Sequence, residues 1–241
     1  MRLDKLISDT TPLSRREATA VIKKGGVSVN GIPVKDPSSH VNPEGDNVIC
    51  LGKRILYNKY VYVMLNKPEG YVSATEDSSL PVVTELLPDE YRRLGLFPVG
   101  RLDRDTVGLM VLTNNGVLAH ALLSPKRHVE KKYFARFAEP LKDGAEDMFK
   151  DGITLADGYE CKSAGIVTSD GRMSGVITLT EGKYHQIKRM LGALSNRVTY
   201  LERISFGNLT LDTSLSRGEW RLLTDDELQG LLSLAPESLR G

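Results

Sequence analysis

One carboxylate, Asp103, stands out as a candidate for chemistry. It lies in the stretch Gly100–Leu109, between Arg101 and Arg104, and an apolar run follows it. Neighbouring cations favour the ionised carboxylate that a nucleophile or a base requires. The pattern predicts a strand that places Asp103 at the edge of a cleft. An ordinary ion pair with either arginine explains the same residues, and Arg-Leu-Asp alone is weak evidence because it also occurs at residues 2–4.

A second carboxylate, Asp105, raises the alternative of a glycoside hydrolase, in which two acids divide the acid and base roles. On a strand, residues i and i+2 share a face about 7 Å apart, so such a pair is possible. The chain has a single tryptophan and only 6% aromatic residues, which disfavours a sugar-polymer site. We therefore interpret Asp105 as structural, satisfying backbone donors in the turn before Gly108.

Two later segments carry further candidates. Tyr133 begins a predicted strand, and its alternation pattern is more typical of a core residue than of a catalytic one. Residues 181–190 follow another predicted strand and enter a helix whose apolar stripe is formed by Ile187, Met190, Leu191 and Leu194. Lys188 and Arg189 flank this stripe. A cation at the rim of a core pairs more strongly with a carboxylate than one in open solvent.

Together, three segments resemble the signature segments of RsuA-type ribosomal RNA pseudouridine synthases. They are Gly100–Leu109, Lys131–Tyr133 and Glu181–Met190. The resemblance implies that Asp103 is catalytic, that Tyr133 packs against the target base, and that Lys188 pairs with the aspartate. A lysine fixes a carboxylate less rigidly than an arginine fork, so we expect the backbone to help orient Asp103. The RNA contacts implied by the resemblance are Arg101, Arg104, Lys183, His185, Gln186 and Arg189.

The implied reaction converts uridine to pseudouridine by breaking the N1–C1′ bond and rejoining uracil through C5. A carboxylate near the sugar must either attack C1′ or assist proton loss at C2′, and the sequence leaves both routes open. No electrons or groups are exchanged, so we expect no cofactor. The spacing of the cysteines and histidines predicts no metal site.

The N-terminal residues carry signals for a small separate domain. Ser14 and Glu17 form a predicted capping box, Gly25-Gly26 ends the helix, and Asn30-Gly31 is a hairpin signal. This order resembles an S4 RNA-binding domain over residues 1–57. The resemblance implies that RNA phosphates are contacted by Arg15, Arg16, Lys23 and Lys24. On charge alone a solvated helix face is the better explanation, since this region has only nine Lys/Arg against six Asp/Glu.

The remaining residues, 58–241, are predicted to form the catalytic domain. Strand-like runs alternate with a few helical patterns, without repeated βαβ spacing, and the last helix opens at Thr224. The pattern predicts an α+β fold built on a mainly antiparallel mixed sheet flanked by helices. Residues 66–70 are predicted to be a turn. The strand-like runs cover residues 60–65, 108–113, 133–137, 175–180, 204–211 and 220–223.

Composition and local segments indicate the compartment and the RNA on which the protein acts. Cys50 and Cys161 are predicted to be buried thiols, and the chain has neither a signal-like start nor a run of about 20 apolar residues. We expect a cytoplasmic monomer without membrane contact. Residues 71–77 and 81–88 resemble the small-subunit branch, which favours 16S rRNA, free or in an assembling small subunit. The alternatives are a 23S rRNA synthase and a non-enzymatic S4-type RNA-binding or assembly factor, and the target uridine stays open.

Overall fold

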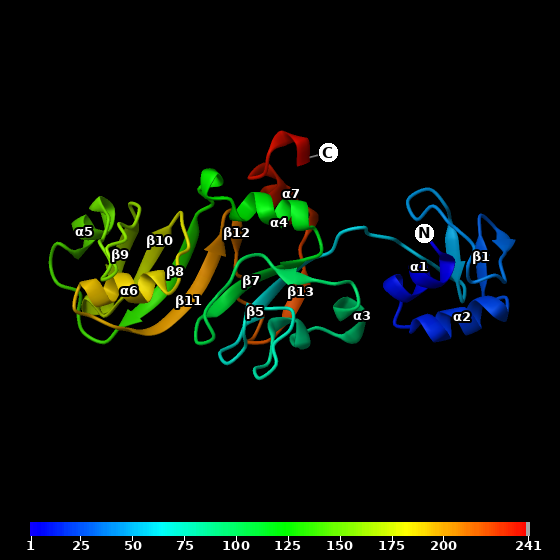
Figure 1. Cartoon of the computed structure of the whole chain (residues 1–241), viewed down its shortest axis with the longest axis horizontal. Helices are drawn as coiled ribbons and strands as arrows, with labels where there is room; N and C mark the ends of the chain where they lie inside the picture. The colour runs from blue at the N-terminus through cyan, green and yellow to red at the C-terminus, as the bar shows by residue number, and fades with distance from the viewer. Residues whose placement is uncertain (240–241) are drawn as a thin grey trace. The chain divides into compact units, whose positions relative to one another are not determined.

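The computed structural model describes residues 1–239, and contacts within it divide the chain into two compact units. The N-terminal unit comprises Met1–Val61 together with Leu87–Leu96, and the larger unit comprises Tyr62–Leu86 together with the chain from Phe97 onward. The predicted boundary between residues 57 and 58 stays a prediction. Residues 240 and 241 of the predicted catalytic range lie outside the described residues. Figure 1 labels most of the elements of both units.

The N-terminal unit packs helices against a small antiparallel sheet. Its helices are α1 (Leu3–Thr10), α2 (Arg15–Lys23) and the short α3 (Asp89–Arg92). The sheet has the order β2-β1-β3-β4. Its strands are β1 (Val27–Val29), β2 (Ile32–Pro33), β3 (Val48–Cys50) and β4 (Lys53–Arg54). Buried side chains from α1, α2, β1 and β3 form one apolar core, which includes Cys50.

Local signals that were read from the sequence are present in this unit. The capping box is complete, because the Ser14 side chain accepts from Glu17 N–H and the Glu17 side chain accepts from Ser14 N–H. Asn30 and Gly31 both have left-handed φ angles, 52° and 80°, as a two-residue hairpin loop requires. Strands β3 and β4 were not predicted, since three- and two-residue strands carry too little pattern to be recognised.

The larger unit is built on one mixed sheet, so the predicted α+β class is confirmed. The path of hydrogen-bonded neighbours is β13-β5-β7-β11-β8-β10-β9, with β12 on β11 and β6 on β7. All of its strand pairs are antiparallel except β7 with β11. The strands are β5 (Tyr62–Lys67), β6 (Phe97–Pro98), β7 (Val107–Thr113), β8 (Lys131–Phe137), β9 (Gly165–Ser169), β10 (Ser174–Leu179), β11 (Val198–Phe206), β12 (Leu209–Thr210) and β13 (Trp220–Leu222).

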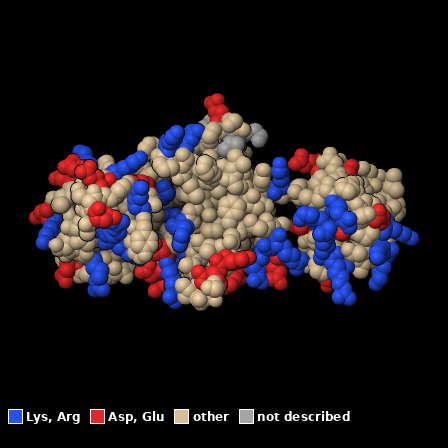
Figure 2. Space-filling view, in the orientation of Figure 1, with Lys and Arg blue, Asp and Glu red and all other residues tan. Residues whose placement is uncertain are grey.

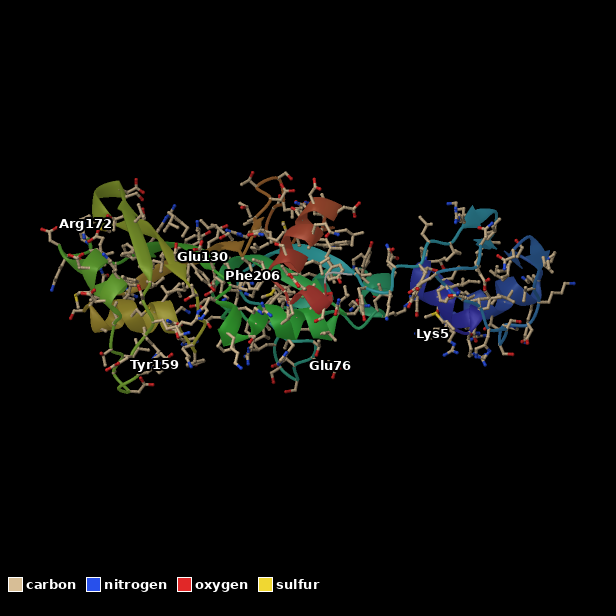
Figure 3. All side chains as sticks on the ribbon, turned by 90° about the horizontal axis from the view of Figure 1, so that it is seen from above. Lys5, Glu76, Glu130, Tyr159, Arg172 and Phe206 are labelled. Carbon is tan, nitrogen blue, oxygen red and sulfur yellow. The ribbon has the colours of Figure 1, made fainter. Side chains whose placement is uncertain are left out.

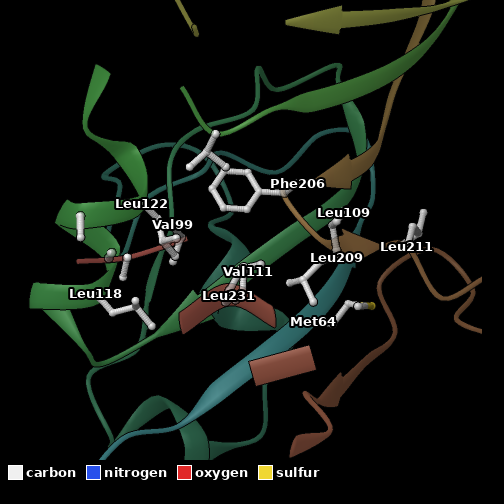
Figure 4. Close-up of a cluster of buried hydrophobic side chains, with 14 residues drawn as sticks. Met64, Val99, Leu109, Val111, Leu118, Leu122, Phe206, Leu209, Leu211 and Leu231 are labelled. Atoms are coloured by element: carbon white, nitrogen blue, oxygen red, sulfur yellow. The ribbon is translucent and has the colours of Figure 1, made fainter. Parts of the chain in front are cut away.

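Helices pack against strands that lie on either side of the parallel pair β7 and β11 in the strand order (Figure 1). Helices α4 and α7 pack with β5, β7 and β12 around a core that contains Val111, Leu118, Phe206 and Leu231 (Figure 4). Helix α6 docks through its predicted stripe, of which Ile187, Met190 and Leu191 are buried. The helices are α4 (Gly116–Leu123), α5 (Ala145–Asp151), α6 (Gln186–Ala193) and α7 (Asp225–Ser233), with one-turn helices η1 (Val83–Leu86), η2 (Pro125–Arg127), η3 (Asp170–Arg172) and η4 (Glu237–Leu239).

The parallel pair brings two backbones unusually close at Gly108. A Cβ atom there would lie 2.4 Å from Arg203 O, and its φ of 98° is one that side chains rarely adopt. Only glycine fits, for both reasons. Gly108 is the second residue of β7, so this close approach fixes where the chain enters the sheet. Asp103 lies in the loop just before that point.

Two predictions about strands were wrong. Residues 204–211 are not one strand, because the chain reverses at Gly207 and Asn208 between β11 and β12. Residues 66–70 are not all turn, because β5 extends through Asn66 and Lys67 and only then bends. In both places a polar or glycine composition hid the strand end. Lys67 in particular is fully buried, which its residue type alone would not suggest.

Candidate active site

Asp103 lies in an irregular loop between β6 and β7, and not on a strand as the sequence had suggested. Its side chain is about a quarter exposed at 26%. The loop makes a tight turn in which Thr106 N–H donates to Asp103 O at 3.1 Å. The carboxylate therefore sits at the edge of the sheet, while the backbone around it is fixed by contacts from neighbouring segments.

Ser73 holds the residue before the aspartate. Its Oγ donates to Leu102 O at 2.8 Å and accepts from Leu102 N at 2.9 Å, so both backbone groups of Leu102 are satisfied by one hydroxyl. Ser73 and Leu102 are both buried. This contact fixes the N-terminal side of Asp103.

Lys67 holds the residues after the aspartate. Its Nζ donates to Thr106 O at 2.8 Å, Pro68 O at 3.0 Å and Arg104 O at 3.2 Å. Burial lowers the pKa of Lys67 to about 8, and the nearby negative charges of Asp105 and Asp103 oppose that shift. The expectation that the backbone helps to orient Asp103 thus has a physical basis, which is a buried cation bonded to three carbonyl oxygens.

Lys188, in the first turn of α6, bridges the two carboxylates of the loop. Its Nζ lies 3.0 Å from Asp103 Oδ2 and 2.5 Å from Asp105 Oδ1. Burial alone would lower the pKa of Lys188, but the hydrogen bonds to Asp105 and Asp103 outweigh burial and raise it. Burial likewise opposes the shift at Asp105, where the contact with Lys188 wins and lowers the pKa. Lys188 therefore keeps its charge at neutral pH.

Asp105 has a different role from the one predicted. The sequence suggested that it satisfies backbone donors in the turn, whereas the structure pairs its carboxylate with Lys188. The geometry of the glycosidase alternative does not apply either, because residues 103–105 are not on a strand. Asp105 is 60% exposed, while Asp103 is the more enclosed of the two. Lys188 thus holds Asp103 Oδ2, and Asp103 Oδ1 lies 3.6 Å from His185 Nε2, beyond ordinary hydrogen-bond distance.

Tyr133 lies on β8 and faces the same pocket, which we call the catalytic pocket. Its lining includes Asp103, Tyr133 and Lys188, so the structure brings together the three residues that the resemblance had singled out. Tyr133 is only 8% exposed. Arg203 on β11 is its cross-strand partner in the β8–β11 register. The complete lining is Arg101, Leu102, Asp103, Thr106, Tyr133, Leu179, Gly182, Lys183, His185, Gln186, Ile187, Lys188 and Leu201.

The predicted RNA contacts of this unit have different surroundings. Arg101 and Lys183 are exposed and line the catalytic pocket. Arg104 is exposed, and its Nε donates to Gly70 O at 3.2 Å. His185 lines the pocket and stacks on Tyr184 with ring centroids 3.8 Å apart. Arg101, Lys183 and His185 therefore share the pocket with Asp103, whereas Arg104 is not among its lining residues.

Two other predicted contacts have structural partners. Arg189 forms an ion pair with Asp157, with 2.5 Å between Nη2 and Oδ2. Gln186 is buried, its Nε2 donates to Glu181 Oε1 at 2.6 Å, and its Oε1 accepts from Lys183 N at 2.9 Å. Gln186 therefore holds the loop between β10 and α6, a role that the sequence-based interpretation as an RNA contact did not include.

The N-terminal unit presents its predicted basic residues to solvent. Arg15, Arg16, Lys23 and Lys24 are all exposed. Arg15 also contacts Asp4, with 3.3 Å between Nη2 and Oδ1. Figure 2 shows Lys and Arg side chains gathered over the part of this unit where Figure 1 draws α1 and α2.

Sequence reasoning missed Leu201, which lines the pocket, and three residues that contact or pair with lining residues: Lys67, Ser73 and Arg203. Their positions depend on contacts between distant segments, such as Lys67 with Arg104 and Arg203 with Leu109. No local signal marked Lys67 or Arg203 as buried. Each follows a polar residue of its own strand, Asn66 and Glu202, and lysine and arginine are almost never fully buried without a partner.

No helix among residues 1–239 is long and apolar enough to cross a membrane. Within the same described range, His, Cys, Asp and Glu side chains form no group of three that could hold a metal ion. Both cysteines are buried free thiols, as predicted.

Family models agree with this geometry. Residues 61–193 match the model described as RNA pseudouridylate synthase, and residues 1–48 match the S4 domain. The chain belongs to the RNA pseudouridylate synthase family. The first match covers more than half of the chain and contains Asp103, Tyr133 and Lys188. The resemblance that was inferred from three short segments is therefore confirmed by a match that spans residues 61–193, and the protein is an isomerase of RNA uridine.

Relatives of this synthase match over nearly their full lengths. An uncharacterized RNA pseudouridine synthase of Bacillus subtilis is 45% identical over 95% of this chain and 97% of its own. Ribosomal small subunit pseudouridine synthase A of Escherichia coli is 35% identical over 96% of this chain and 100% of its own. A crystal structure of a pseudouridylate synthase superposes with a TM-score of 0.68 at 36% identity, covering 96% of this chain and 99% of that one.

Proposed function

We propose that this synthase converts one uridine of 16S ribosomal RNA to pseudouridine, with Asp103 as the catalytic carboxylate. The observation that carries the proposal is the Lys188 ammonium that holds Asp103 at the catalytic pocket opposite Tyr133. Relatives named ribosomal small subunit pseudouridine synthase A, at 35% to 37% identity, support the choice of RNA.

The reaction asks little of the protein beyond placement and charge. The N1–C1′ bond breaks, the C5–C1′ bond forms, the C5 proton is lost and N1 gains a proton. In our proposal the carboxylate of Asp103 either attacks C1′ or assists proton loss at C2′. Lys188 keeps that carboxylate charged and fixed, while Lys67 and Ser73 hold the backbone on either side of it.

Tyr133 has a separate role in the proposal. A base taken out of its helix loses stacking, which an aromatic ring in a pocket replaces. Tyr133 supplies such a ring in the catalytic pocket, and its hydroxyl is a candidate for handling the C5 proton. Arg101 and Arg104 are proposed to hold phosphates of the flipped nucleotide.

The rest of the proposal concerns the setting. We infer that the S4 domain, residues 1–57, contacts RNA phosphates through Arg15, Arg16, Lys23 and Lys24. All four are exposed, which is what a phosphate contact requires. We further infer a cytoplasmic monomer, in keeping with its two free thiols and its RNA substrate, acting on free RNA or on an assembling small subunit.

The test is tritium release. Transcripts of 16S and 23S rRNA carrying tritium at uracil C5, and assembling small subunits, are incubated with the protein, and the modified position is mapped. Release from 16S rRNA or its subunit supports the proposal. Release only from 23S rRNA overturns the choice of RNA, and release from no substrate favours an S4-type binding factor.

A further inference from the structure

A second cavity adjoins the catalytic pocket and is lined by more cations than anions. It shares Arg101, Tyr133, Gly182 and Lys183 with that pocket. The basic side chains in its lining are Arg101, Lys131, Lys162, Lys183 and Arg203, whereas Glu181 is the one acidic side chain in it. We call it the basic cavity. Its aromatic walls include Tyr159 and Phe206, which Figure 3 labels.

The one carboxylate of this cavity is already engaged. Glu181 Oε2 accepts from Tyr159 Oη at 2.8 Å, and its Oε1 accepts from Lys162 N at 2.9 Å and from Gln186 Nε2 at 2.6 Å. These bonds direct the carboxylate toward the loop. Glu181 is thus bonded to uncharged donors, and none of the five cations of the cavity forms a salt bridge among residues 1–239.

Two of these cations, one buried and one half-buried, lie close to one ring. Arg203 is 2% exposed, and its Nε donates to Leu109 O at 2.7 Å. Lys131 donates to Val129 O at 2.7 Å. The guanidinium carbon of Arg203 and the Lys131 Nζ lie 5.4 and 5.7 Å from the centroid of the Phe206 ring. Arg203 is buried and Lys131 is half-buried, so two like charges near one ring are costly, and an anion in the cavity would relieve that cost.

The titration of Lys131 is consistent with this picture. Burial lowers its pKa to about 8, the positive charge of Arg203 adds to the shift, and Glu181 opposes it. A bound anion would oppose these effects and raise the pKa of Lys131. Lys131 would then keep its proton to a higher pH in the complex than in the free protein.

We propose that the basic cavity binds a backbone phosphate of the RNA, belonging to a nucleotide adjacent to the uridine in the catalytic pocket. This inference rests on the proposed function. RNA is the favoured source of the phosphate because the two cavities share Arg101 and Tyr133, so one strand can enter both. A backbone phosphodiester carries one negative charge and is accessible from solvent. It therefore matches the single anion that these cations would bind.

The test compares 16S transcript binding by Lys131→Met, Lys131→Arg and a matched control, Lys132→Met. Lys132 is the next residue on the same strand, is exposed, pairs with Glu130 and lines neither cavity. One phosphate contact contributes about 0.7 to 0.9 to the slope of log Kd against log salt, so Lys131→Met should bind about five- to eightfold more weakly at about 0.1 M salt. Its salt slope should be correspondingly shallower, and Lys132→Met should show neither change.

A pH series separates a phosphate contact at Lys131 from general electrostatics. The wild-type affinity should fall as pH rises through the pKa of Lys131, because the free ammonium loses its proton. Lys131→Arg keeps its charge and should abolish that fall while retaining wild-type affinity near pH 7. Equal losses in Lys131→Met and Lys132→Met, or an unchanged pH dependence in Lys131→Arg, would overturn the proposal. Because the readout is binding, failure here is distinct from failure of the wild-type enzyme to modify 16S rRNA.

An independent observation concerns Thr106, which is 1% exposed in the lining of the catalytic pocket. Its Oγ1 is buried and has no hydrogen-bond partner among the described residues. Buried hydroxyls are almost always paired, so an unpaired one in a pocket points to a ligand. We infer that Thr106 Oγ1 hydrogen-bonds to the edge of the uracil ring, a role that also rests on the proposed function.

Thr106→Val tests this role, because it keeps the shape and removes the hydroxyl. If the hydroxyl serves the substrate, kcat/KM falls about tenfold or more while the melting temperature is unchanged or higher, since no internal bond is lost. Thr106→Ser should restore activity. Wild-type kcat/KM in Thr106→Val, or a fall that Thr106→Ser does not rescue, would overturn the inference without bearing on which RNA is modified.

Discussion

Replacing Lys67 with methionine removes the buried cation that holds the Asp103 loop. At pH 7, three hydrogen bonds to a charged group are worth about 1.5 to 3 kcal/mol each. Against this stands the cost of burying the charge, about 3.4 kcal/mol for a pKa lowered from 10.5 to about 8. The hydrogen bonds win, and we expect Lys67→Met to lose about 1 to 6 kcal/mol of stability at pH 7.

The pH dependence of that loss is the sharper expectation. Between the two pKa values the unfolded chain binds the Lys67 proton and the folded chain releases it, so this group makes the wild type more stable as pH rises. With a folded pKa of about 8 and an unfolded value of 10.5, its contribution grows by about 1.3 kcal/mol from pH 7 to pH 9. Lys67→Met lacks this contribution. The stability gap between wild type and variant should therefore widen by about that amount.

The assay is urea unfolding of both proteins at the two pH values, with the exposed Lys150→Met as the matched control. The control should leave the stability and its pH dependence unchanged. We also expect kcat of Lys67→Met to fall about 10- to 100-fold, because a loosened loop misplaces the carboxylate. A stability difference between wild type and Lys67→Met that stays constant or narrows from pH 7 to pH 9 would refute this account of Lys67.

The remaining predictions concern the bridge at Lys188 and the close approach at Gly108. Lys188→Met should lower kcat about 10- to 100-fold, because Asp103 loses a partner worth about 1 to 3 kcal/mol. Lys188→Arg should retain more activity than Lys188→Met. Equal activity of the two variants would contradict the role of the charge. Gly108→Ala should lose more than about 2 kcal/mol in thermal unfolding, because its Cβ would meet Arg203 O at 2.4 Å. Gly158 has a similar positive φ but nothing within 4 Å of an added Cβ, so Gly158→Ala measures the conformational cost alone. A loss of stability in Gly158→Ala as large as that in Gly108→Ala would contradict the contribution of the clash.

The sequence was most informative where structure is local. The capping boxes at Ser14 and Thr224, the Asn30-Gly31 hairpin and the buried side of α6 depend on residues close together in the chain, and all are present. Asp103, Tyr133 and Lys188, which line one pocket, were singled out for another reason. Their segments carry the family's pattern, which periodicity alone would not have revealed.

What could not be predicted depends on long-range contacts. The partners of Lys67 at Arg104 and Thr106 lie almost forty residues away, and Arg203 reaches Leu109 across the parallel pair. No local pattern shows that these cations are buried. The role of Asp105 was misjudged for the same reason, because its partner Lys188 is 83 residues distant.

The central claim is that Asp103 carries the chemistry. Its most direct test is tritium release from C5-labelled 16S transcript by Asp103→Asn, with Asp105→Asn as the matched control. Our account predicts no release by Asp103→Asn with RNA affinity close to wild type, and retained turnover by Asp105→Asn. Turnover by Asp103→Asn comparable to the wild type, or its loss in Asp105→Asn alone, would contradict it.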